Sequence, residues 1–155
     1  MNIAERNAPV EALAPQTNAG ALTGDFINMG KAGHVTVAVH ITQATTDEVA
    51  ITLEQATDVS ASGAKAIAKE VPIFTNQDCA GGDAFTAQTP AVAFTTSTAI
   101  KHKLVLFEVS AEHLDVAGGY SCLLVKCAAS HASNIVSALY IPGLRRYSDA
   151  SLITD

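Results

Sequence analysis

The stretch GHVTVAVHIT, Gly33–Thr42, decides the fold class of this 155-residue chain. Apolar and more polar residues alternate in it without interruption, and successive side chains of an extended strand point to opposite faces. One face therefore carries only β-branched apolar residues, namely Val35, Val37, Val39 and Ile41. The other face carries His34, Thr36, Ala38, His40 and Thr42. We predict a half-buried β-strand with one face against a core.

Similar stretches recur along the chain, separated by about 10–15 residues, and almost no helical periodicity is present. The clearest are EVAITLEQA (48–56), HKLVLFEVS (102–110), YSCLLVKCA (120–128) and IVSALYI (135–141). The sequence therefore predicts an all-β fold, an antiparallel β-sandwich of about eight strands, either jelly-roll or immunoglobulin-like. A closed small barrel is the alternative.

The two ends of the chain differ from this strand-rich middle. Residues 1–20 include Pro9, Pro15 and Gly20 and lack a sustained period, so we predict an N-terminal arm there. Residues 21–141 form the predicted β-sandwich domain. Residues 142–155, PGLRRYSDASLITD, are predicted to be an exposed C-terminal tail.

Composition narrows the class of protein. Charged residues make up only 15% of the chain, against about 25% in a typical domain, and the net charge is −6. So few charges favour a protein that hides more of its surface in an assembly. A chain this acidic is not expected to bind nucleic acid. No run approaches about 18 consecutive apolar residues, so no membrane span is expected. The three cysteines are expected to be free thiols, as they would be in a reducing cytosol.

The residues with chemical potential do not combine into a site. Cys122 and Cys127 lie five positions apart on one predicted strand, on opposite faces and about 16 Å from each other, so they cannot pair or share a zinc ion. Cys79 lies in an acidic loop with no histidine near it in sequence. The loop TNQDCAGGD (75–83) has oxygen ligands but not the order of a calcium loop. We therefore predict no catalytic residue, no metal and no cofactor.

The stretch LDVAGGYSC (114–122) resembles the approach to the sixth strand of immunoglobulin domains, where a tyrosine forms a corner hydrogen bond. The chain has no tryptophan, and no cysteine in its early strands could pair with Cys122. The resemblance therefore supports a sandwich corner at Tyr120 rather than a true immunoglobulin domain.

Four stretches, taken in order, resemble small structural proteins of tailed bacteriophages. They are GHVTVAVHI, VAITLEQATDVSASGAKAI, FEVSAEHLDVAGGYSCLLVKC and ASNIVSALYIPGLRRY, which together extend over roughly residues 20–147. The resemblance implies a β-sandwich virion component, a head decoration (cement) protein. It implies no catalytic residue. Its expected partners are the major capsid protein and copies of itself, as a homotrimer at three-fold positions on the capsid exterior.

Two alternatives stay open at this stage. One is a tail or neck component with the same fold. The other is a surface carbohydrate-binding module, for which Phe26, Phe74 and Phe85 are the first candidates. An enzyme is the class that the sequence favours least.

The predicted partner contacts lie in the two ends of the chain. On the arm they are Val10 and Leu13, and on the tail they are Arg145, Arg146 and Tyr147. Each end could become ordered on a neighbouring protein and so add contacts.

Overall fold

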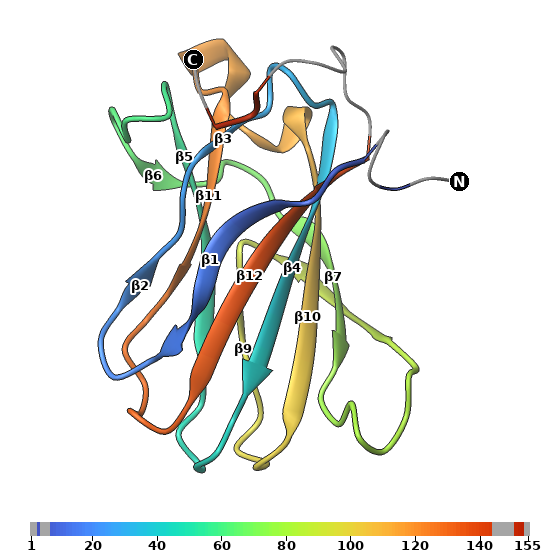
Figure 1. Cartoon of the computed structure of the whole chain (residues 1–155). Coiled ribbons are helices and arrows are strands. Elements are labelled where there is room, and N and C mark those ends of the chain that lie inside the picture. Colours follow the sequence, from blue (N-terminus) through green and yellow to red (C-terminus); the bar gives the residue numbers. More distant parts are fainter. Residues whose placement is uncertain (1–2, 4–6, 144–150, 154–155) are drawn as a thin grey trace.

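The computed structural model describes residues 3, 7–143 and 151–153, which form two six-stranded sheets with antiparallel pairing throughout (Figure 1). Sheet A contains, in spatial order, β1 (Val10–Thr17), β12 (Ile135–Pro142), β4 (His34–Thr42), β10 (His102–Ser110), β7 (Val71–Asn76) and β8 (Thr86–Ala91). Sheet B contains β2 (Leu22–Thr23), β11 (Cys122–Cys127), β5 (Ala50–Ala56) and β6 (Lys65–Ala66). In addition, β3 (Ile27–Asn28) pairs with β11, and β9 (Ala93–Thr95) pairs with β5. The predicted antiparallel sandwich is confirmed.

The connections between the sheets identify the fold as a jelly roll. The chain passes from β1 in sheet A to β2 and β3 in sheet B, returns to β4, crosses to β5, and later runs from β10 to β11 and back to β12. This gives the order β1-β12-β4-β10 in one sheet over β2-β11-β5-β6 in the other, the interlocked arrangement of two Greek keys. The hairpin β7–β8 extends sheet A beyond β10. Short strands and this hairpin raise the number of strands from the predicted eight to twelve.

The core lies between the two sheets and follows the alternation seen in the sequence. Val35, Val37, Val39 and Ile41 of β4 are fully buried. They face Ile51 and Leu53 of β5 and Leu123, Val125 and Cys127 of β11 within one buried cluster. Strand β7 contains a register shift between Val71 and Ile73, so Pro72 lies at a bulge, where a strand tolerates proline. Among the described residues no helix is long and apolar enough to span a membrane.

A buried tyrosine links the two sheets. Tyr140 of β12 is fully buried, and its hydroxyl donates to the carbonyl of Asp25 at 2.8 Å. The same hydroxyl accepts a hydrogen bond from the backbone N–H of Val125 in β11 at 2.9 Å. Tyr120, the tyrosine predicted to form a sandwich corner, is only partly buried, and its ring lies 4.0 Å from the ammonium group of Lys65. The bridging role therefore belongs to Tyr140.

The predicted N-terminal arm is wrong for residues 10–17, which form β1 and pair with β12. The side chains of Ala12 and Leu13 are buried in the core. The prediction failed because the strand is irregular. Its register shifts twice, between Glu11 and Leu13 and again between Leu13 and Gln16, so its sequence does not alternate.

The predicted exposed tail is also wrong at its described end. Leu152 is 1% exposed and belongs to the main core cluster. The backbone N–H of Asn28 donates to the carbonyl of Leu152 at 2.6 Å. The chain therefore returns to the sandwich beside β3 after it leaves β12 (Figure 1).

Candidate functional site

The feature that stands out is the outer face of sheet A, which carries a row of apolar side chains across five strands. Residues opposite each other in register point to the same face. Leu139 of β12 is opposite Ala38 of β4, Ala38 is opposite Leu106 of β10, Leu106 is opposite Phe74 of β7, and Phe74 is opposite Ala87 of β8. Leu139 is 43% exposed, and Ala38, Leu106 and Phe74 are half-buried. We call these five residues the apolar row.

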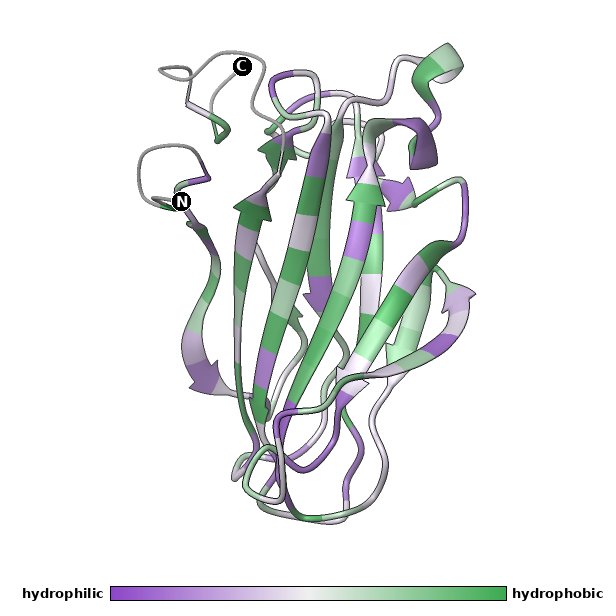
Figure 2. Ribbon diagram, turned by 90° about the vertical axis from the view of Figure 1, so that its right-hand side faces the viewer, coloured by the Kyte–Doolittle hydropathy of each residue, from purple (hydrophilic) through white to green (hydrophobic). Residues whose placement is uncertain are grey.

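The rows on either side of the apolar row contain few charges. Figure 2 shows the strands of the sandwich side by side, with hydrophobic and more polar segments alternating along them. The outward-facing residues of the four central strands, which we call the sheet-A face, are Ile135, Ser137, Leu139, Ile141, His34, Thr36, Ala38, His40, Thr42, His102, Leu104, Leu106, Glu108, Ser110, Pro72, Phe74 and Asn76. Glu108 is the one acidic residue in this set, which contains no lysine or arginine. Its carboxylate lies 3.0 Å from His34 Nε2 and accepts a 2.9 Å hydrogen bond from Thr36.

The outer face of sheet B is different, because it is polar or covered. Lys126 of β11 and Glu54 of β5 form an ion pair there at 3.4 Å. Leu124 and Cys122, which also point outward from β11, are buried in a second cluster with Phe26. The two faces of the sandwich are therefore unequal, and the larger uncovered apolar surface belongs to sheet A.

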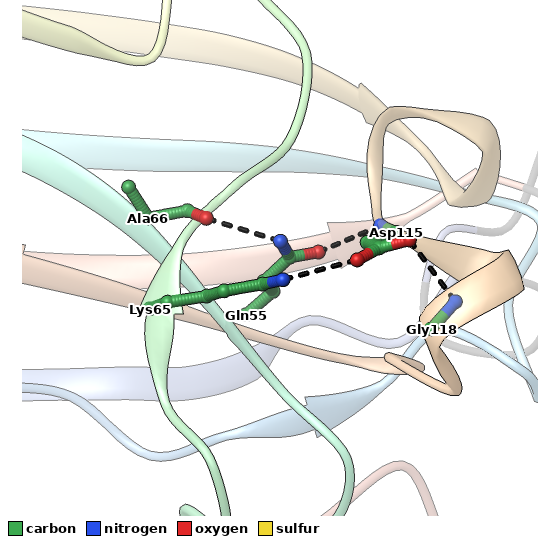
Figure 3. Close-up of polar contacts among 5 residues, drawn as sticks. All are labelled: Gln55, Lys65, Ala66, Asp115 and Gly118. Carbon is green, nitrogen blue, oxygen red and sulfur yellow. Dashed lines mark hydrogen bonds and ion pairs between the residues drawn. The ribbon is translucent and has the colours of Figure 1, made fainter.

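The loop between β10 and β11 is fixed to sheet B by Asp115 (Figure 3). Its carboxylate accepts hydrogen bonds from Lys65 Nζ and from the backbone N–H of Gly118, each at 3.0 Å. Its own backbone N–H donates to Gln55 Oε1 at 2.7 Å, and Gln55 Nε2 donates to the carbonyl of Ala66 at 3.0 Å. The ion pair with Lys65 and the hydrogen bond from Gly118 lower the pKa of Asp115. Because every polar group in the network is engaged, its role is structural.

This loop also borders a small apolar cavity of about 310 Å³ at the same end of the sandwich. It is lined by Met29, Gly30, Ala111, Glu112, Leu114, Val116, Tyr120 and Ser121. The short helices η1 (Ala111–His113) and η2 (Val116–Gly118) supply much of this lining. Glu112 is the one carboxylate on the lining, and no base–nucleophile pair is present in it. The cavity could enclose a small apolar group.

A buried lysine closes the opposite end of the sandwich. Lys103, at the start of β10, is fully buried, and its ammonium group donates to Gln43 Oε1 at 2.8 Å. It also donates to the carbonyl and hydroxyl oxygens of Ser97, at 2.6 Å and 3.2 Å. Burial lowers the pKa of Lys103, and the negative charge of Glu48 opposes that shift. The three donors of the ammonium group thus have three acceptors, which makes Lys103 a structural tie between loops. The alternation of β10 could have revealed it, because Lys103 shares its face with Val105 and Phe107.

The cysteines lie as the sequence predicts. Cys127 faces the main core and Cys122 the second cluster, so the two are on opposite faces of β11. Burial raises the pKa of Cys127 to about 12, which keeps the thiol protonated and unreactive. Cys79 is partly buried, and its thiol lies 3.8 Å from the carbonyl oxygen of Asn76.

The other candidate ligands are scattered or already engaged. In the part of the chain that the structure describes, no three histidine, cysteine or acidic side chains are grouped as a metal would require. In the loop 75–83, Asp78 forms an ion pair with Lys101 at 2.9 Å and accepts from the N–H of Gly81. Asn76 Oδ1 accepts from the N–H of Asp78.

The three phenylalanines considered for carbohydrate binding do not form a platform. Phe26 is buried at 7% exposure, Phe74 lies on the sheet-A face, and Phe85 is exposed in the segment that precedes β8.

The predicted contact residues have different outcomes. Leu13 is 5% exposed inside β1, so it is a core residue and not a contact. Val10 is half-buried at the start of the same strand. Arg145, Arg146 and Tyr147 lie outside the described residues. Sequence reasoning missed the apolar row, because its members come from five strands whose register is not visible in the sequence.

Comparison with known proteins adds no relative, since no family model, curated protein or solved structure matches this chain. The fold and the surface therefore define only a class, a jelly-roll domain with one uncovered apolar sheet face.

Proposed function

We propose that this protein is a non-enzymatic structural component of a tailed-phage virion, a decoration protein that binds the outer head surface and stabilises it. The observation that carries the proposal is the sheet-A face. A jelly-roll fold serves viral coats and lectins alike, so the fold alone does not select a function. A broad, sparsely charged face with a continuous row of apolar side chains across it is typical of a surface that contacts other proteins.

The resemblance to phage structural proteins agrees with this surface. Its four stretches fall on β4, on β5 and β6, on β10 and β11, and on β12. These strands include the centres of both sheets and most of the sheet-A face. The similarity thus concerns the part of the chain that forms the sandwich and its uncovered surface, rather than peripheral loops.

The charge distribution supports a position on the outside of the head. The chain carries a net charge of −6, which disfavours contact with packaged DNA. The capsid contact is proposed to involve Val10 and the segment with Arg145, Arg146 and Tyr147, since Leu13 is buried in the core. Self-association as a homotrimer at three-fold positions follows from the resemblance.

Particles that lack the gene provide the test. The purified protein should co-sediment with such particles, occupy them in hundreds of copies, and restore their resistance to heat. Binding of about six or twelve copies at the portal end would replace the proposal with its alternative, a neck or tail component. Failure to bind the particles at all would refute both.

The contact residues can be tested in the same assay. The triple variant Arg145→Ala/Arg146→Ala/Tyr147→Ala should lose capsid binding, whereas Lys69→Ala, which removes one positive charge between β6 and β7, should retain it. A triple substitution is preferable to truncation after Pro142, because truncation would also remove the buried Leu152. Full binding by the triple variant would show that this segment is not the contact.

A further inference from the structure

The cavity of about 310 Å³ lies at the end of the sandwich where η1 and η2 connect β10 to β11 (Figure 1). Two of its lining side chains, Met29 and Leu114, are 1% and 2% exposed, whereas Val116 is 63% exposed. The cavity therefore has a buried apolar wall and an opening to solvent. A dry apolar cavity of about 150 Å³ is large enough to bind benzene. This one has room for an aromatic ring with a short side arm.

Most of the backbone donors around this cavity are already engaged inside the protein. The N–H of Met29 donates to the carbonyl of Ser121 at 2.7 Å, and the N–H of Gly30 donates to Asn28 Oδ1 at 2.8 Å. Five further lining residues also donate their N–H groups to carbonyl oxygens of the chain, namely Ala111, Leu114, Val116, Tyr120 and Ser121. A negatively charged ligand would therefore find few donors to replace the hydration that it loses on entry.

Glu112 gives the cavity its charge, since it is the one charged residue of the lining. Its side chain is exposed, and it forms no ion pair with any residue that the structure describes. Lys69 and Asp115 border a neighbouring hollow of about 330 Å³, which Glu112 also lines, and they do not line the cavity itself. Asp115 is in addition paired with Lys65 at 3.0 Å. The Glu112 carboxylate is thus available to a positive charge that enters the cavity.

From these observations we propose that the cavity binds an apolar group that carries a positively charged amine. The apolar part packs against Met29, Leu114 and Val116, and its burial supplies the affinity. The ammonium group lies at the Glu112 carboxylate, which supplies the preference for positive charge. Both a small free amine and an apolar residue at the amino terminus of a peptide have this chemistry. The site goes beyond the proposed function and does not depend on it.

Three probes of similar shape and different charge test the site. They are phenethylammonium, phenethyl alcohol and hydrocinnamate, which join the same ring to a positive, a neutral and a negative group. In amide NMR spectra of the isotope-labelled full chain, the positive and neutral probes should shift the signals of Gly30, Val116 and Tyr120. The dissociation constant of phenethylammonium should be on the order of 1 mM, because the ligand is small. Phenethyl alcohol should bind about five-fold more weakly, and hydrocinnamate more weakly still.

Two matched variants separate the carboxylate from the net charge of the chain. Glu112→Gln keeps the shape of the side chain and removes its charge, so phenethylammonium and phenethyl alcohol should then bind equally well. Glu70→Gln removes the same charge from an exposed residue that lines neither the cavity nor the neighbouring hollow, and it should leave the five-fold preference intact. Both residues are exposed, and the amide spectra themselves show whether each variant is folded.

Three results would overturn the proposal. They are no shift at the lining residues with any probe, a preference for the ammonium probe that survives in Glu112→Gln, and a preference that is lost equally in Glu70→Gln. A peptide with phenylalanine at a free amino terminus distinguishes the two sources of the ligand. If it binds as tightly as phenethylammonium and its acetylated form does not, the ligand is a protein terminus, whereas binding of the free amine alone indicates a small molecule. Capsid binding is measured separately, so its failure would refute the proposed function without affecting this result.

Discussion

Replacing Tyr140 with phenylalanine should show how much one hydroxyl contributes to holding the two sheets together. The substitution keeps the aromatic ring, so it leaves no large cavity in the core. It removes the group that accepts from the N–H of Val125 at 2.9 Å and donates to the carbonyl of Asp25 at 2.8 Å. Because burial raises the pKa of Tyr140, the hydroxyl is protonated and able to donate at all ordinary pH values.

The expected magnitude follows from what each partner can do afterwards. Val125 is fully buried, so its N–H would have no replacement acceptor, and an unsatisfied buried donor costs about 1–3 kcal/mol. Asp25 is exposed, so water can satisfy its carbonyl oxygen. We therefore expect the free energy of unfolding to fall by about 2 kcal/mol, which for a domain of this size lowers the melting temperature by roughly 4–8 °C.

Urea denaturation at equilibrium measures this difference, and an unchanged m-value would show that the compactness of both states is retained. Tyr120→Phe is the matched control, since it removes the same group from a partly exposed side chain. It should change the free energy of unfolding by less than about 0.5 kcal/mol. A Tyr140→Phe variant as stable as the control would contradict the idea that this hydroxyl joins the sheets.

Three further predictions concern other parts of the fold. Burial raises the pKa of Cys127 from 9.0 to about 12. The stability that its protonated thiol contributes to the folded state is therefore fully present below pH 9 and is lost as the pH rises toward 12. Between pH 9 and 11 stability should fall by about 1.4 kcal/mol per pH unit from this group, and a Cys127→Ala variant should show a shallower slope in urea denaturation at each pH. Gly119 has a positive φ of 84°, whereas Gly20 does not, and an added Cβ would meet nothing within 4 Å at either position. The two substitutions to alanine therefore differ only in backbone strain. In thermal denaturation, Gly119→Ala should destabilise the protein by about 1 kcal/mol more than Gly20→Ala. Leu152→Ala should cost about 2–4 kcal/mol in urea denaturation, whereas Ile153→Ala, at a side chain 48% exposed, should cost little; equal effects would contradict the burial of the chain end.

The sequence predicts the sandwich because apolar and polar residues alternate in its central strands, as the period of an extended strand requires. In β4 every second residue is a branched apolar side chain, and all four of these are fully buried. The same rule places Cys122 and Cys127 on opposite faces of β11. Patterns of this kind depend only on the period of an extended strand, so they can be read without knowing which strands pair.

The alternation pattern fails to reveal a strand that forms only because it pairs with a strand far away in the sequence. Strand β1 breaks the alternation at Ala12 and Leu13, which are both buried, and it is recognisable as a strand only through its pairing with β12 near the other end of the chain. Leu152 is a comparable case, because two adjacent apolar residues, Leu152 and Ile153, in a short polar segment give no periodic signal. In both places long-range packing outweighs the local features that favoured a flexible segment.

The surface of sheet A shows a different limit, because part of its signal, the two apolar faces of β10, is present in the sequence, whereas the register that aligns the apolar row is not. In HKLVLFEVS, Val105, Phe107 and Val109 point into the core, but Leu104 and Leu106 on the opposite face are also apolar. An antiparallel strand with one face in water should carry polar residues there, and apolar residues on both faces are typical of strands covered on both sides. One cover is sheet B. The described residues provide no second layer over Leu106, which is nevertheless partly buried by its neighbours in the sheet, so the pattern of β10 predicts a cover that these residues do not supply.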